Sequence, residues 1–274
     1  MNVVVLTRNP RGIASRFLAR RSIEVVGVLL DQGTVGDRRA HLRAKARKLL
    51  RIGPTALPVG LLLRRAYAAA AGEAPSLDEL GVPVAPVQTL NGEAARDALR
   101  RFGADIAVSL DNTLIEEATF ALPAYGTVNV HHGAVPKYRG GPPVFWELAD
   151  GRDRVGFTVH RVDAGIDTGP VLAEGEVPIV QRRSLRATLE ATIPTLHDAS
   201  LDVLEQVLRT LAGDGLEERP QQAGGHLRTT PTLRDYLRVR RRLREELKRM
   251  PGPPTPAGVE PGAAPESERA AGTQ

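Results

Sequence analysis

A chain of 274 residues, of which 42% are hydrophobic and 25% are charged, can bury a substantial core in one large domain or two small ones. Because it contains no cysteine, disulfides, thiolate metal sites and a cysteine nucleophile are excluded. The net charge of +5 fits nucleic acid, anionic lipid or phosphorylated partners. We favour the simpler interpretation, which is an arginine-rich composition without a particular partner.

No segment approaches the roughly 20 apolar residues that a membrane-spanning helix needs, and the N-terminus shows no signal peptide. The lack of cysteine also suits the cytoplasm. We therefore expect a soluble cytoplasmic protein without a membrane span.

The first 30 residues predict a strand, a helix and a second strand, at 2–7, 12–20 and 23–30. This order is typical of a βαβ unit. The alternation continues, with strands predicted at 82–87, 106–110, 127–132, 156–162 and 171–179, and helices at 93–101 and 113–120. We therefore expect an α/β, Rossmann-like fold, with a mostly parallel twisted sheet and helices on both faces. Such sheets bind ligands beyond the carboxyl ends of their strands.

Residues 36–71 form a basic insertion in which arginines and lysines are interleaved with leucines. We expect a helical segment that is broken at Gly53-Pro54. Such a surface could bind an anionic substrate or, weakly, the headgroups of a membrane surface. We favour a solvated helix whose arginines cover apolar surface.

The C-terminal part is predicted to be helical and then disordered. Apolar residues at helical spacing predict a helix at 184–211, which Pro194 kinks or divides. A last, arginine-rich helix is expected at 232–249, and the Pro/Gly/Ala-rich tail at 250–274 is expected to be disordered. These features separate a main domain (1–212), a helical extension (213–249) and a tail.

Three polar side chains lie in turn-rich or strand-end positions, where catalytic groups are often displayed. Asn129 and His131 belong to one predicted strand, and Asp167 follows in a glycine-containing loop. Side chains alternate along a strand, so Asn129 and His131 share one face while His132 points to the other. A lone histidine is more often structural, but its two polar partners favour a functional role for His131.

These residue types suit acyl transfer. Asparagine can orient an imidazole and donate its NH2 to a developing oxyanion, and aspartate can accept the other imidazole proton and raise the pKa of the histidine. The absence of cysteine and of a Gly-x-Ser-x-Gly motif argues against a covalent acyl-enzyme. The pattern predicts direct attack of a bound nucleophile on a bound acyl carbon, and we assign no metal ligands.

The same motifs resemble the 10-formyltetrahydrofolate-dependent formyltransferase family, which includes the methionyl-tRNA, glycinamide ribonucleotide and sugar N-formyltransferases. The family's Asn-x-His pair falls on Asn129 and His131, its Pro-x-Tyr-Arg-Gly loop on residues 136–140, and its Asp-Thr-Gly aspartate on Asp167. The resemblance is most specific over 127–170 and extends loosely to about residue 210. It identifies the main domain as a catalytic formyltransferase domain.

The resemblance implies that an acceptor amine attacks the formyl carbon of 10-formyltetrahydrofolate. Asn129 and protonated His131 would stabilise the oxyanion, and Asp167 would tune His131 and help to move a proton to N10 of the folate. The family also implies contacts to the pterin, which fall here on Leu110, Asn112, Leu114, Asp163 and Ile166. The leucines could equally be core residues. The acceptor loop would contain Gly133, Pro136, Arg139 and Gly140.

Two departures from the family bear on the acceptor. Gly133 stands where many members have serine, and Phe145-Trp146 resembles the sugar-type members. Together with the helical C-terminal part, these features favour a nucleotide-linked amino sugar or another small biosynthetic amine. Methionyl-tRNA and glycinamide ribonucleotide are alternatives, as is a non-catalytic protein whose basic helices bind nucleic acid or lipid. Each basic stretch holds a single aromatic residue, Tyr67 or Tyr236, which is too few for base stacking, so we do not expect nucleic-acid binding.

Overall fold

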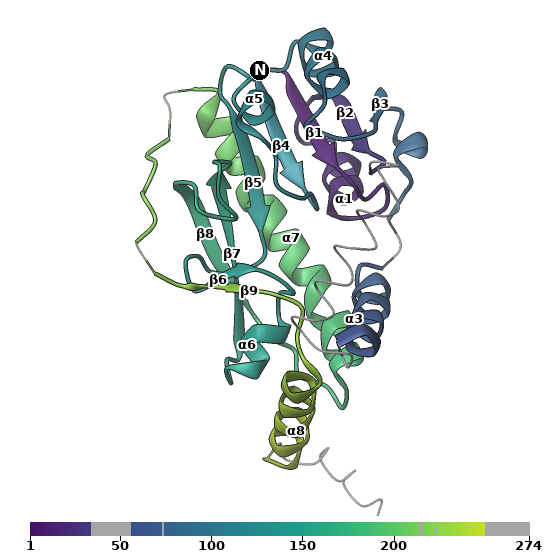
Figure 1. Ribbon diagram of the computed structural model, residues 1–274, viewed down its shortest axis with the longest axis vertical. Helices are drawn as coiled ribbons and strands as arrows, with labels where there is room; N and C mark the ends of the chain where they lie inside the picture. Colours follow the sequence, from purple (N-terminus) through teal and green to yellow (C-terminus); the bar gives the residue numbers. More distant parts are fainter. Residues whose placement is uncertain (34–55, 73, 214–215, 223, 250–274) are drawn as a thin grey trace, which may run out of the picture.

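A seven-stranded mixed sheet forms the centre of the protein, which Figure 1 shows as a computed structural model. The structure describes residues 1–33, 56–72, 74–213, 216–222 and 224–249. The strands follow the order β3-β2-β1-β4-β5-β7-β8; β7 and β8 are antiparallel to their neighbours and the others are parallel. Their bounds are Val3–Thr7 (β1), Val25–Asp31 (β2), Val84–Val87 (β3), Ile106–Leu110 (β4), Thr127–His131 (β5), Arg154–Arg161 (β7) and Val171–Pro178 (β8). The expected α/β fold is confirmed.

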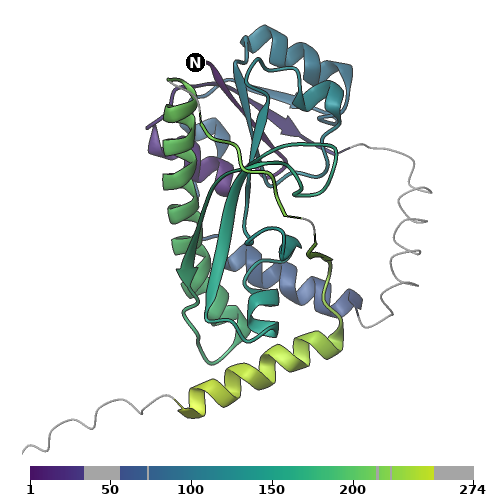
Figure 2. The same ribbon diagram turned by 90° about the vertical axis from the view of Figure 1, so that its left-hand side faces the viewer.

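Helices cover both faces of this sheet (Figures 1 and 2). Helices α1 (Ile13–Arg20) and α7 (Leu185–Leu211) pack on one face, and α4 (Glu93–Phe102) packs on the other. The remaining described elements are α3 (Ala56–Ala70), the 3-10 helix η1 (Leu77–Leu80), α5 (Glu117–Phe120), α6 (Phe145–Ala149), α8 (Leu233–Arg249) and a small parallel sheet of β6 (Tyr138–Gly140) and β9 (His226–Arg228). None of the described helices is long and apolar enough to cross a membrane.

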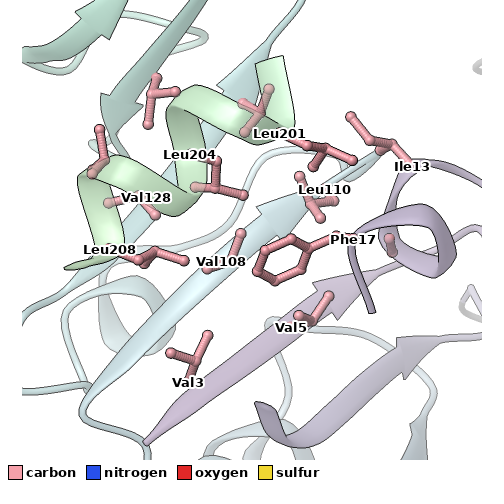
Figure 3. Close-up of a cluster of buried hydrophobic side chains, with 14 of the residues drawn as sticks. Val3, Val5, Ile13, Phe17, Val108, Leu110, Val128, Leu201, Leu204 and Leu208 are labelled. Carbon is pink, nitrogen blue, oxygen red and sulfur yellow. The ribbon is translucent and has the colours of Figure 1, made fainter. Parts of the chain in front are cut away.

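The core under α1 and α7 is built from alternate residues of the central strands (Figure 3). Val3 and Val5 of β1 and Val108 and Leu110 of β4 pack with Phe17 of α1 and with leucines of α7. Fully burying one such side chain contributes about 1.5–3 kcal/mol. The intervening residues of β1 and β4 pack toward α4, so both strands are apolar on both faces. The polar residues of these two strands lie near their carboxyl ends, at Thr7 and Ser109.

A second core joins α3, α6 and α8 to the N-terminal half of α7. It contains Leu63 of α3, Leu189 of α7 and Leu243 of α8, all of which are buried. Helix α3 is the described part of the predicted basic insertion, and it buries an apolar face. The rest of the insertion, including the expected break at 53–54, and the tail at 250–274 lie outside the described residues.

The structure corrects the helix expected at residues 113–120, which is helical only from Glu117. The side chain of Asn91 donates to the backbone oxygen of Leu114 (3.2 Å) and accepts from the backbone N–H of Glu116 (2.9 Å). These bonds satisfy backbone hydrogen-bonding groups of this segment, so it does not need to be helical.

The C-terminal part differs from the expectation in two ways. Helix α7 continues through Pro194 and is not divided there. The expected helical extension also contains a strand, because β9 pairs with β6 and α8 begins only at Leu233. Sequence periodicity could not reveal this pairing, since β6 and β9 are three residues long and far apart in the chain.

Candidate active site

A cavity of about 1030 Å³ lies at the carboxyl ends of β1, β4 and β5. Its wall includes Arg8 after β1, Asn112 after β4 and His131 at the end of β5. This is the edge where open α/β sheets bind ligands. The predicted catalytic residues Asn129, His131 and Asp167 all line this cavity.

Strand β5 sends its side chains alternately to the core and to the cavity. Its two valines belong to the core under α7. Asn129 and His131 alternate with them along the strand and lie on its other face. His132 turns to α7, where its Nε2 lies 3.1 Å from the hydroxyl oxygen of Ser200. The alternation of a regular strand thus separates the two adjacent histidines.

The imidazole of His131 is held between two acceptors. Its Nε2 lies 2.6 Å from the backbone oxygen of Tyr138, and its Nδ1 lies 3.3 Å from Oδ2 of Asp167. A carbonyl oxygen can only accept, so Nε2 carries a proton. The contact with Asp167 is favourable when a second proton lies between the two side chains. The geometry therefore allows Nδ1 of His131 to carry a proton that it donates to the carboxylate of Asp167.

Burial and charge act in opposite directions on this pair. Burial lowers the pKa of His131, and the Asp167 carboxylate and the Tyr138 carbonyl only partly restore it. Burial alone would raise the pKa of Asp167. The contacts of Asp167 with two imidazoles and with the backbone N–H of Gly140 outweigh burial, so that its pKa is lowered. Asp167 is therefore ionised at neutral pH.

The second of these imidazoles belongs to His160 of β7, which the sequence analysis did not identify. Its Nδ1 lies 2.7 Å from the backbone oxygen of Arg161 and must donate to it. In the neutral ring, Nε2 then accepts from the side-chain amide of Asn129, 3.1 Å away. His160 lies directly opposite Asn129 in the antiparallel β5–β7 pair. Only this pairing register places His160 in the site, and the register cannot be read from the sequence alone.

The residues expected to contact folate fall into two groups. Leu114 and Ile166 line the cavity with 51% and 47% of their surface exposed, and Asn112 and Asp163 also line it. Leu110 is fully buried and belongs to the core in Figure 3, which corrects its assignment as a folate contact. As the last residue of β4, it faces α1 and α7 rather than the cavity.

The loop that carries Asp167 is closed by its own polar groups. Oδ1 of Asp163 accepts from the hydroxyl of Thr168 (2.6 Å) and from the backbone N–H of Gly165 (3.1 Å). Asp167 itself has a φ of +52°, in the left-handed region that aspartate tolerates better than most residues. The loop thus presents the carboxylate through a backbone conformation that its neighbours must hold in place.

The loop after β5 approaches the site mainly through its backbone. Gly140 lines the cavity, and its N–H donates to Oδ2 of Asp167 at 2.8 Å. Gly133 packs behind His131: a Cβ at this position would clash with the backbone oxygen of Tyr138 and would lie 2.6 Å from Nε2 of His131. Glycine therefore leaves the room that the His131 ring occupies.

Two other residues predicted for the acceptor loop do not belong to the cavity wall. Pro136 follows a cis peptide bond and packs near Gly225. The guanidinium of Arg139 points to the C-terminal segment, where its Nη2 donates to the side-chain oxygen of Gln221 at 2.9 Å. These residues shape the loop, and the structure gives no direct contact of either with the cavity.

A second pair of imidazoles lies between β5 and α7, and both residues also line the cavity. The rings of His132 and His197 stack with their centroids 4.9 Å apart. Burial lowers the pKa of His132 well below its ordinary value and that of His197 to about 4. Both rings are therefore neutral at neutral pH, and His132 gains the stacking partner that the sequence did not reveal.

Comparison with known proteins identifies the family to which this site belongs. Residues 69–207, just over half of the chain, match the family model for formyl transferases. The chain belongs to the formyl transferase family. The methionyl-tRNA formyltransferase of Deinococcus radiodurans is 34% identical to it over 182 residues, which cover 66% of this chain and 54% of that protein. The chain thus spans about half the length of the curated relatives it matches.

Solved structures agree with this fold. A sugar N-formyltransferase from Shewanella superposes with a TM-score of 0.54 at 15% identity, covering 88% of this chain and 87% of that one. WlaRD, a sugar 3N-formyl transferase solved in the presence of dTDP and 5-N-formyl-THF, superposes with a TM-score of 0.52 at 15% identity, covering 89% and 78%. At these identities the likeness extends to the fold alone.

Proposed function

We propose that this protein transfers a formyl group from 10-formyltetrahydrofolate to a primary amine. The observation that carries the proposal is the contact of His131 with Asp167 beside Asn129, at the wall of a large cavity in a chain of the formyl transferase family. The buried pair can hold a proton next to a bound carbonyl group. That arrangement suits acyl transfer without a covalent enzyme intermediate.

In the proposed reaction the amine nitrogen attacks the formyl carbon, and the carbonyl electron pair moves to oxygen to give a tetrahedral oxyanion. The Asn129 amide donates to this oxyanion, and the positive charge of protonated His131 stabilises it, while Asp167 keeps the proton on His131 as the charge forms. Collapse of the intermediate breaks the bond to N10, which takes up the proton lost by the amine. The products are the formylated acceptor and tetrahydrofolate.

Two apolar side chains support the proposal that a folate is the formyl donor. Leu114 and Ile166 expose about half of their surface to the cavity, although isolated leucine and isoleucine side chains favour burial. Together they offer an apolar edge to a flat ring, and Asn112 adds hydrogen-bonding groups beside them.

The acceptor is proposed to be a phosphate-bearing amine, and methionyl-tRNA is the first candidate. Arg8 and Arg64 are among the residues that line the cavity, and a guanidinium group binds phosphate well. The Deinococcus relative acts on methionyl-tRNA by its name and shares a third of its residues with the matched part of this chain. We rank the amino sugar second, because the tryptophan that suggested it is engaged elsewhere. Trp146 donates to the backbone oxygen of Thr229 and packs beside Arg228, and it is not among the residues that line the cavity.

The test is a panel of acceptors mixed with 10-formyltetrahydrofolate, with release of tetrahydrofolate followed by absorbance. The panel contains methionyl-tRNA, uncharged tRNA, a dTDP-linked amino sugar and glycinamide ribonucleotide. Turnover with methionyl-tRNA but not with uncharged tRNA would support the first candidate, and turnover only with the sugar would support the second. Absence of folate binding and of turnover with every amine would refute formyl transfer.

A further inference from the structure

The segment between α7 and α8 crosses the loops of the active site. Its strand β9 pairs in parallel with β6, and Leu227 is the partner of Arg139 in this register. The backbone of Arg228 packs against Gly140, where no side chain could fit. Figure 1 shows β9 beside β6, in front of the lower part of the main sheet. It lies beyond residues 69–207, the part of the chain that matches the family model.

One side chain of this segment, Gln221, joins the two loops of the site. Its Oε1 accepts from Nη2 (2.9 Å) and Nε (3.3 Å) of Arg139 in the loop after β5. Its Nε2 donates to the backbone oxygens of Asp167 (3.0 Å) and Gly169 (2.7 Å) in the other loop. Both hydrogens of the amide and its oxygen are therefore used.

One of these bonds falls on a residue with a strained backbone. Asp167 is in the left-handed region, a conformation that costs about 1–3 kcal/mol for a residue other than glycine and persists only where its surroundings hold it. Gly140 holds the side chain of Asp167, and Gln221 holds its backbone carbonyl. The two anchors meet the residue from opposite ends, which sets the direction of the carboxylate toward His131.

We propose that Gln221 is a positioning residue, which fixes Asp167 against His131 by tying the Asp167 loop to Arg139. The proposal rests on the formyl-transfer function only where it predicts an effect of Gln221 on the rate of turnover. The geometry itself concerns the free protein and can be tested without an acceptor. Gln221 does not itself line the cavity, so it acts on the site through the residues that it holds.

The first measurement is the pKa of His131 in the full chain, from the pH dependence of its imidazole NMR signals, assigned by their absence in His131→Gln. In Gln221→Ala the carboxylate of Asp167 is free to move away, which removes the interaction that raises the pKa of His131. We expect a lower pKa than in the unaltered protein.

Two further variants separate positioning from folding. Gln221→Leu keeps the size of the side chain without its hydrogen bonds and adds no charge, so it should lower the pKa of His131 as well. Gln222→Ala is the matched control, because Gln222 is the next residue in the chain, is also a glutamine and is exposed. It should leave both the pKa of His131 and the melting temperature unchanged.

The second measurement is turnover, once an acceptor is known. Gln221→Ala should lower kcat at least tenfold while the KM for folate changes less than threefold, since Asn112 and Leu114 lie outside the tethered loop. An unchanged pKa of His131 in both Gln221 variants would overturn the proposal, as would an unchanged kcat. If no amine is formylated by the unaltered protein, the proposed function fails, whereas the pKa comparison still decides the role of Gln221.

Discussion

Nδ1 of His131 lies 3.3 Å from Oδ2 of Asp167, and the same carboxylate oxygen accepts the N–H of Gly140 at 2.8 Å. The carboxylate therefore connects the end of β5 with the loop that follows it. Burial lowers the pKa of His131, and Asp167 is the largest influence that opposes this effect. The protonated form of His131 thus depends on the charge of Asp167.

Replacing Asp167 by asparagine should therefore abolish most of the activity. The amide keeps the shape of the side chain but carries no charge, so the pKa of His131 should fall further and its protonated form should cost more free energy at neutral pH. We expect kcat to drop by about 10²–10⁴, the range for proton-transfer groups, with little change in folate affinity. Steady-state kinetics with the best acceptor measures this. Asp97→Asn on the exposed surface of α4 is the control, and a mutant at Asp167 with normal kcat would contradict the mechanism.

Gly133 should tolerate no side chain. A Cβ there would clash with the Tyr138 carbonyl and lie 2.6 Å from Nε2 of His131, which is closer than packed atoms allow. Gly133→Ala should displace the imidazole and lower kcat at least tenfold. Gly60→Ala in α3 is the matched control, because its Cβ would meet only a methyl group at 3.8 Å, and alanine favours a helix over glycine by about 0.5–1 kcal/mol. A fully active Gly133→Ala would show that the His131 ring has more freedom than its contacts indicate.

Much of this fold can be predicted from the sequence because its signals are local. Apolar runs and helical spacing give the main strands and helices, and strand alternation distinguishes His131 from His132. Contacts between distant segments cannot be read in this way. The register of β5 against β7 brings His160 to Asn129, and the pairing of β6 with β9 brings Gln221 to Asp167.

Leu110 illustrates the same limit at the level of one side chain. The sequence places it at the end of a strand beside the ligand-binding edge, where either the core or the cavity could receive it. The direction of a strand-end side chain depends on the packing of helices from elsewhere in the chain. Here α1 and α7 cover that face, and Leu110 is buried between them and the sheet.

His197 should make the protein more stable as the pH rises from about 4 to 6.5. Its pKa is about 4 in the folded protein and near 6.5 in an unfolded chain, so the unfolded state binds more protons across this range. The loss of stability at the acidic end amounts to roughly 3 kcal/mol. Urea unfolding at several pH values measures it. In His197→Gln the dependence should flatten by most of this amount, whereas His226→Gln, an exposed site, should leave it unchanged. Equal slopes in the two variants would contradict the assignment.

Glu147 should produce the opposite trend. Burial raises the pKa of its carboxyl to about 7, and neither of its carboxylate oxygens has a hydrogen-bond partner among the described residues. Between about pH 4.5 and 7 the folded state therefore binds more protons than the unfolded state, and stability falls as the pH rises, by roughly 3 kcal/mol in total. Glu147→Gln should remove this decline, so that its free energy of unfolding exceeds that of the unaltered protein most clearly at pH 8. Glu117→Gln, on an exposed turn of α5, is the control. A variant at Glu147 that loses stability equally at pH 5 and pH 8 would show that the carboxylate has a buried partner after all.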